Sequence, residues 1–180
     1  TNACGNVTVY IQGDIALSNS KPVIFTLHDI GSNHLSWNLL VNHPSMAEIK
    51  ARGIFVHMDV PGQEDDAPDL PSDYKFPDMN HLAEAVVEIL DQLKVDCVIG
   101  VGEGAGANIL ARFGMIAPKR CVGLCLIHCT STKAGVMEYF KDKLINWKLE
   151  HGMNPTAEEY LVFHKFGTDV SAQIENAPNQ

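Results

Sequence analysis

The sequence predicts an α/β domain in which a mostly parallel β-sheet carries helices on both faces. Two observations support this fold class. Apolar segments of strand length alternate with segments whose apolar residues recur at the 3.6-residue period of an α-helix. Several of the strand-length segments are apolar throughout, which is typical of strands covered on both faces, as in a parallel sheet.

Five segments are predicted to be strands. The first, NVTVYIQG at 6–13, alternates apolar and polar residues and is predicted to be half-buried. The other four are nearly continuous runs of aliphatic and β-branched residues, at 22–28, 54–60, 95–102 and 121–129.

Helices are predicted between these strands. Residues 80–94 place their apolar side chains on one stripe, and residues 107–116 do the same. Residues 45–51 form a shorter candidate helix that ends before Gly53.

The character of the chain changes after Cys129. Two helical segments follow with no strand between them, the second with Asn154 as its cap and Gly167 at its end. We therefore expect residues 1–132 to form the N-terminal six-strand portion of a larger core. Residues 133–180 are expected to be the truncated start of a helical cap, with the C-terminal part of the fold missing.

Composition excludes several classes of function. Twenty-two acidic residues against 13 basic ones give a formal net charge of −9, which argues against nucleic-acid binding. The sequence shows neither a signal peptide nor an apolar run long enough to span a bilayer. Together with cysteines that are expected to be unpaired, this predicts a cytoplasmic protein.

The cysteines and histidines do not predict a metal site. Cys121, Cys125 and Cys129 are spaced by four within a predicted strand, where such positions lie about 13 Å apart and cannot converge on one ion. We expect these thiols and that of Cys97 to be reduced and buried as small apolar side chains. The histidines form no HExxH pattern. Neither a metal nor a cofactor is therefore predicted.

A glycine-rich turn, GEGAGA, joins the predicted strand at 95–102 to the helix that follows. It fits the dinucleotide-binding pattern only loosely, and the next strand ends without the acid that would bind a ribose. It fits the G-x-S-x-G nucleophile elbow at both outer glycines, with glycine in place of the central serine. The corresponding residues are Gly102, Glu103, Gly104, Ala105 and Gly106.

Two further segments are similar to the α/β-hydrolase pattern. TLHDIGSNHLSW at 26–37 resembles the segment that supplies an oxyanion-hole N–H, with Asp29 in place of a glycine. HMDVPGQ at 57–63 resembles the turn after the next strand of that fold. The segment after the last predicted strand, HCTSTKAG, offers no alternative triad acid. Because a catalytic triad acts as a unit, we expect no ester hydrolysis by this chain.

The longest resemblance is to the N-myc downstream-regulated (NDRG) family. LHDIGSNHLSW, MDVPGQEDDAPDLPSDYKFPDM, VIGVGEGAGANILARFGMIAPKRCVGLCLI and KAGVMEYFKDKL carry it, from about Asn6 to Leu144. The resemblance implies an α/β-hydrolase fold without hydrolase activity and cytoplasmic roles in stress response, growth control and differentiation. It makes Gly104 the lost nucleophile position, and His28, Asp29 and Ile30 a vestigial oxyanion pocket.

The side chains around this turn also have structural interpretations. We expect Asp29 to cap the turn that follows it, and Glu103 to stabilise the nearby helix N-terminus. His57 and His128 are expected to be core histidines with satisfied hydrogen bonds.

The resulting functional prediction is a non-enzymatic protein that acts through protein partners in stress response, growth and differentiation signalling, or trafficking. Peripheral membrane association is a further expectation, as is self-association through an exposed sheet edge at 121–129. Two alternatives remain open. One is an esterase-like hydrolase whose unorthodox catalytic residues lie in the absent C-terminal part, and the other is a protein that senses a small molecule in the old pocket.

Overall fold

A computed structural model describes residues 1–2, 4–68, 70–71 and 73–129 of the 180-residue chain. These residues belong to a unit that spans Thr1–Ser131. The predicted cap at 133–180 lies outside the described residues, so it stays a prediction.

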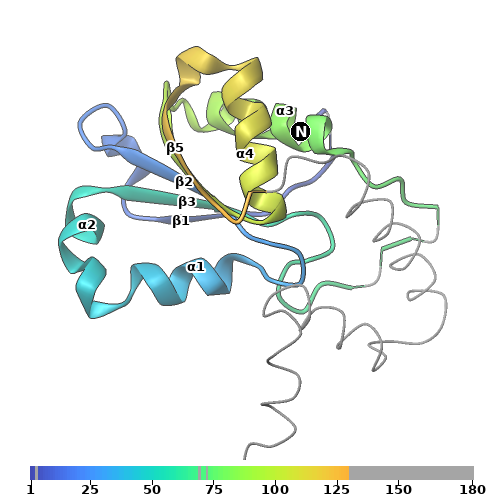
Figure 1. Ribbon diagram of the computed structural model, residues 1–180, viewed down its shortest axis with the longest axis horizontal. Helices are drawn as coiled ribbons and strands as arrows, with labels where there is room; N and C mark the ends of the chain where they lie inside the picture. Colours follow the sequence, from blue (N-terminus) through green and yellow to red (C-terminus); the bar gives the residue numbers. More distant parts are fainter. Residues whose placement is uncertain (3, 69, 72, 130–180) are drawn as a thin grey trace, which may run out of the picture. The chain divides into compact units, whose positions relative to one another are not determined.

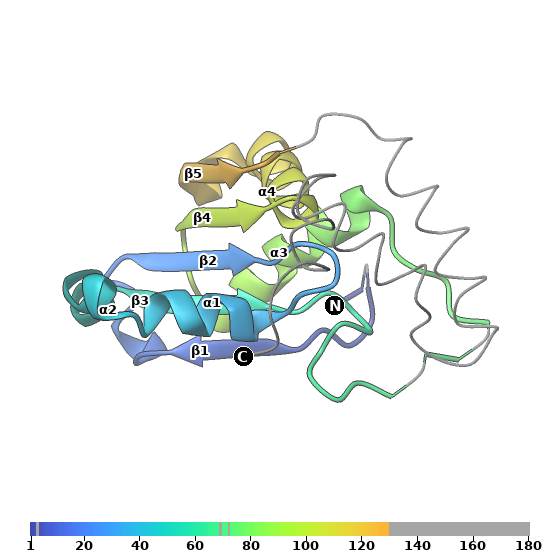
Figure 2. The same ribbon diagram turned by 60° about the horizontal axis from the view of Figure 1, so that its bottom comes forward.

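The described residues form one five-stranded sheet in the order β1-β3-β2-β4-β5, which Figure 2 shows side by side. All neighbouring strands are parallel except β1, which pairs antiparallel with β3. This confirms the mostly parallel sheet. The strands are β1 Val9–Gln12, β2 Val23–Leu27, β3 Ile54–Met58, β4 Val98–Glu103 and β5 Cys121–Ile127.

Helices cover both faces of this sheet, as the sequence predicts (Figure 1). Helices α1 and α2 lie on one face, and α3 and α4 lie on the other. The helices are α1 His34–Val41, α2 Ala47–Arg52, α3 Met79–Leu93 and α4 Ala105–Ile116.

The central strands β2 and β3 are buried along their full length because each face packs against a different helical layer. Phe25 and Leu27 of β2 belong to a core that includes side chains of α3 and α4. Ile24 faces the other way and packs with Val41 of α1 and with Phe55. This two-sided burial is the reason that these strands are apolar at successive positions.

Local signals set the bounds of the helices. Asp78 caps α3 by accepting hydrogen bonds from the N–H groups of Asn80 and His81, and Lys94 ends it in the left-handed conformation. Helix α1 was not predicted by the periodicity argument. Its sequence signal is Asn33, whose side chain accepts a hydrogen bond from the N–H of Leu35.

Three expectations about the core were wrong. The described residues contain five strands rather than six, because a turn with a short 3₁₀ helix, Ile15–Leu17, leads from β1 directly to β2. Cys97, Cys125 and Cys129 are exposed, since Cys97 lies in the turn before β4 and the other two lie on or beyond β5. His128, which was expected in the core, is exposed as well.

Strand β5 is the last strand of the sheet in the part of the chain that the structure describes. Among its apolar side chains, Val122 is 66% exposed, and Leu126 and Ile127 are also exposed. The predicted position of this strand at a sheet edge is therefore confirmed for the described residues.

Candidate functional site

The site is built on the tight turn between β4 and α4, which we call the elbow (residues 102–106). Gly104 is its only residue outside strand and helix, with φ 53° and ψ −113°. Residues with a side chain rarely adopt this positive φ, which is why glycine suits the position. The N–H of Gly104 donates to the carbonyl of Ile127 on β5, at 2.9 Å.

The flanking glycines allow α4 to lie close to the sheet. A Cβ atom on Gly106 would lie 2.4 Å from the backbone oxygen of Leu27, and one on Gly102 would lie 2.8 Å from the N of Ala107. Neither backbone atom can move aside without separating α4 from β2 or β4. The glycines at 102 and 106 are therefore required by packing, whether or not the turn carries out chemistry.

Asp29 reaches into the elbow from the end of β2. Its side chain is buried, at 5% exposure, and Oδ1 accepts a hydrogen bond of 3.0 Å from the N–H of Ala105. A Cβ atom on Gly104 would lie 2.1 Å from the same Oδ1. The carboxylate thus occupies the space into which a side chain at position 104 would project.

We expected the side chain of Asp29 to cap the turn that follows it. In that turn the N–H and the hydroxyl of Ser32 donate to the backbone carbonyl of Asp29. The carboxylate stabilises the N-terminus of α4, because that end of a helix carries unsatisfied N–H groups and partial positive charge.

His28 holds the backbone of this turn. Its Nε2 accepts a hydrogen bond of 3.0 Å from the N–H of Val60, so Nδ1 carries the proton and donates to the carbonyl of Asp29, at 2.8 Å. Burial lowers the pKa of His28, which favours this neutral form. His28 therefore fixes the direction in which the chain leaves β2.

A buried carboxylate lies behind this turn, at the end of β3. Asp59 accepts hydrogen bonds from the backbone N–H of His34, at 2.6 Å, and from its Nδ1, at 2.7 Å. The His34 ring stacks on Tyr10, with 3.5 Å between ring centroids. The sequence analysis did not single out this pair, although both residues lie in the two hydrolase-like segments. It fixes the start of α1 against β3.

The other residues predicted around the site have different surroundings. Glu103, the last residue of β4, and Ile30 are both half-buried. His57 lies in the core, where Nδ1 shares a hydrogen bond of 2.6 Å with the hydroxyl of Thr26. Burial lowers the pKa of His57 to about 4. Its Nε2 lacks a hydrogen-bond partner among the described residues, so His57 is only partly satisfied.

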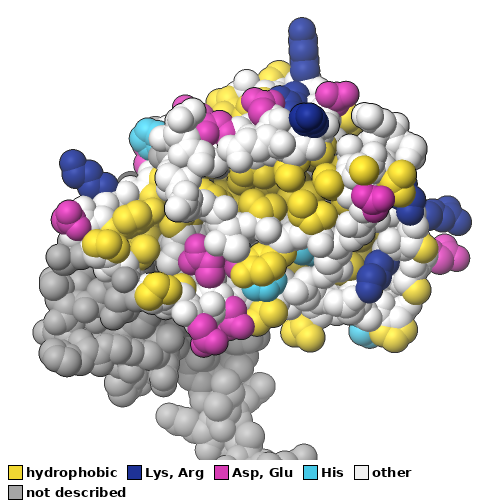
Figure 3. Space-filling model, turned by 180° about the vertical axis from the view of Figure 1, so that it is seen from behind, with side chains coloured by type: hydrophobic (Ala, Val, Ile, Leu, Met, Phe, Trp, Pro, Cys, Tyr) yellow, Lys and Arg dark blue, Asp and Glu magenta, His cyan; other side chains and the backbone are white. Residues whose placement is uncertain are grey.

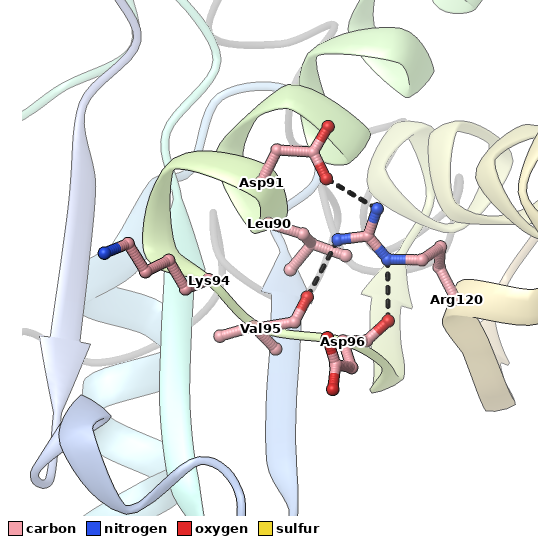
Figure 4. Close-up of a pocket in the computed structure, with 6 residues that line it drawn as sticks. All are labelled: Leu90, Asp91, Lys94, Val95, Asp96 and Arg120. Carbon is pink, nitrogen blue, oxygen red and sulfur yellow. Dashed lines mark hydrogen bonds and ion pairs between the residues drawn. The ribbon is translucent and has the colours of Figure 1, made fainter.

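Two hollows lie away from the elbow. One, of about 480 Å³, lies at the opposite end of β4, where Arg120 donates to Asp91 and to the carbonyls of Val95 and Asp96 (Figure 4). Through these contacts Arg120 stabilises the turn between α3 and β4. The second hollow, of about 400 Å³, is lined mainly by apolar side chains of α1, α2, β2 and β4.

Three further observations concern metal ligands, helix length and surface charge in the described part of the chain. No group of three or more His, Cys, Asp or Glu residues there could hold a metal ion. None of the described helices is both long and apolar enough to cross a membrane. On the face that Figure 3 shows, Lys and Arg side chains do not gather into one patch, and hydrophobic side chains gather nearer its centre.

The sheet order, the antiparallel edge strand and the strand–glycine–helix elbow together define an α/β-hydrolase fold. Solved structures agree. A hydrolase from Pseudomonas aeruginosa superposes with a TM-score of 0.66 at 18% identity, over 94% of this chain and 65% of that one. The protein BpoC from Mycobacterium tuberculosis gives a TM-score of 0.62 at 16% identity, over 91% of this chain and 55% of that one. Identities this low establish the fold alone.

Within that fold the chain belongs to the Ndr family, whose sequence model matches residues 1–178. A protein of Caenorhabditis elegans is 45% identical over 96% of this chain and 53% of its own length. Protein NDRG1 of Xenopus tropicalis is 40% identical over 83% of this chain and 37% of its own. The chain thus spans about half the length of these relatives, or less.

Proposed function

We propose that this chain is part of a non-catalytic α/β-hydrolase-fold protein, which acts in the cytoplasm by binding protein partners. One observation carries the proposal. The position that holds the nucleophile in a G-x-S-x-G elbow is Gly104, and the space beside it is filled by the carboxylate of Asp29.

Both features oppose acyl transfer. Glycine has no hydroxyl or thiol to attack a carbonyl carbon, and none of the other described elbow residues provides one. An oxyanion is stabilised by N–H donors aimed at the position where the negative charge develops. Here the N–H of Ala105 already donates to a carboxylate, whose charge would repel that oxyanion.

The role that we propose for this protein rests on what the resemblance to the NDRG family implies. We propose participation in stress response, growth and differentiation signalling, or trafficking, with peripheral membrane contact where trafficking is involved. The exposed apolar side chains of β5 support self-association of the 180-residue chain, because an unpaired edge strand can pair with a second copy.

The decisive assay measures hydrolysis of p-nitrophenyl esters of increasing acyl length by the full-length protein. We expect no turnover above buffer. The controls are Asp29→Asn and Glu103→Gln, which remove the two acids at the elbow one at a time. Turnover in the unaltered protein that either substitution abolishes would refute the non-catalytic proposal.

Partner binding is tested by cross-linking and affinity capture with the full-length protein in cytosol. The matched control is a variant with Gly104→Ala and Asp29→Ala, which alters the elbow but leaves the surface unchanged. Capture of the same proteins by both forms is expected if partners bind the surface. Loss of every partner in the double variant would indicate that the old pocket is the binding site.

A further inference from the structure

The elbow retains part of an anion-binding arrangement. In hydrolases with a nucleophile elbow, the N–H of the residue after the nucleophile contributes to the oxyanion hole. That residue is Ala105, the first residue of a twelve-residue helix. Its N–H donates to Asp29, and the receiving oxygen lies where the side chain of residue 104 would project.

We propose that Asp29 is an internal ligand of this anion position, closing it to any external carboxylate or acyl oxygen. The inference rests on the proposed function and deepens it. Loss of the nucleophile explains why bond cleavage does not occur, whereas the internal carboxylate explains why the position cannot bind an acid or ester either.

Three features of the described residues make Asp29 an occupant rather than an ordinary helix cap. The carboxylate comes from a residue 76 positions away in the sequence, so it is not part of the helix's own N-terminal turn. It fills the space beside Gly104, which is open only because residue 104 lacks a Cβ atom. The backbone of Asp29 is fixed by His28 and Ser32, so the side chain is directed inward.

The ligand class follows from the occupant. A position that accepts the carboxylate of Asp29 has the size and charge for a small monocarboxylate, once the side chain is removed. We therefore expect Asp29→Ala to create a site for acetate, and Asp29→Asn to leave the position filled by a neutral isostere. Wild-type protein should not respond to acetate.

The experiment uses the full-length protein in sodium acetate and in sodium chloride of equal ionic strength. Because a ligand that binds only the folded state raises stability, the midpoint of thermal unfolding of Asp29→Ala should rise by about 1–2 °C in acetate over chloride. For wild type and for Asp29→Asn, the midpoint of thermal unfolding should be the same in acetate as in chloride. In spectra of ¹⁵N-alanine-labelled protein, the Ala105 amide should shift in Asp29→Ala and return towards its wild-type position with acetate.

Each other outcome counts against the proposal. An equal response of Asp29→Ala and Asp29→Asn, or no response in folded Asp29→Ala, overturns it. If Asp29→Ala does not fold, Asp29→Ser is tested in the same way. Movement of the Ala105 amide of wild-type protein on addition of acetate would show that the position is open, and also overturns it. None of these readouts depends on ester turnover, so the two proposals fail separately.

Discussion

Replacing Gly104 with alanine tests the geometry of the elbow most directly. Two costs are expected. An L-residue held at φ 53° and ψ −113° is strained by about 1–3 kcal/mol. The new Cβ atom would also lie 2.1 Å from Oδ1 of Asp29, so the carboxylate must leave and give up its hydrogen bond to Ala105. A hydrogen bond to a charged group contributes about 1.5–3 kcal/mol.

The sum is a loss of about 2.5–6 kcal/mol in the free energy of unfolding. Removing Asp29 first should eliminate the second cost. In an Asp29→Ala background, Gly104→Ala should therefore cost only the backbone strain, about 1–3 kcal/mol. The two substitutions should be less than additive by about 1.5–3 kcal/mol, the value of the hydrogen bond that both remove.

Chemical denaturation of the full-length protein and of the three variants measures this coupling in a double-mutant cycle. Gly123→Ala is the matched control, because a Cβ atom there meets nothing within 4 Å and the expected change is within about 0.5 kcal/mol. Additive costs, with a coupling below about 0.5 kcal/mol, would refute the placement of the carboxylate beside Gly104.

Four other predictions concern stability and assembly. Gly106→Ala should cost more than about 4 kcal/mol, because its Cβ atom meets the rigid backbone of β2; near-normal thermal stability would contradict this. The pKa of His57 is lower in the folded protein than in the unfolded one, so the unfolded state binds more protons between pH 6.5 and about 4, and about 3 kcal/mol of stability should be lost as the pH falls through that range. In His57→Gln, the denaturation midpoint should fall less steeply than in wild type as the pH drops from 6.5 to about 4. Arg120→Lys should speed amide hydrogen exchange in the turn between α3 and β4, because one ammonium cannot replace a guanidinium that donates to three acceptors. Unchanged exchange rates would show that Arg120 does not stabilise this turn. Val122→Lys should reduce self-association of the 180-residue chain in light scattering, and a monomeric parent chain would remove the basis of that prediction.

Much of the fold could be predicted from local patterns. The helix at 80–94 was placed within one residue at each end, because its apolar stripe has a single period. Strands β2 and β3 were found because both of their faces are covered, so that burial shows directly in composition. Helix α1 escaped prediction because its apolar residues Leu35, Leu39 and Leu40 remain exposed and obscure the buried stripe.

The sequence was less informative about the exposed thiols and about β5. A run such as CVGLCLIHC is apolar enough for a buried strand, and burial was expected for that reason. Exposure depends on which neighbours lie on each side of the strand. In the described part of the chain β4 pairs with one edge of β5, and Cys125 stays exposed.

The identity of residue 104 alone shows that the central position of the elbow carries no hydroxyl, because glycine has no side chain. The strand–glycine–helix turn could also be predicted from the sequence, since the backbone conformation that requires glycine involves only two or three neighbouring residues. What lies beside Gly104 depends on packing between distant parts of the chain. Asp29 and Ala105 are 76 residues apart, and the direction of the carboxylate depends on the parallel pairing of β2 with β4 and on the turn that His28 holds. Contacts of that range arise from packing, which no local pattern encodes.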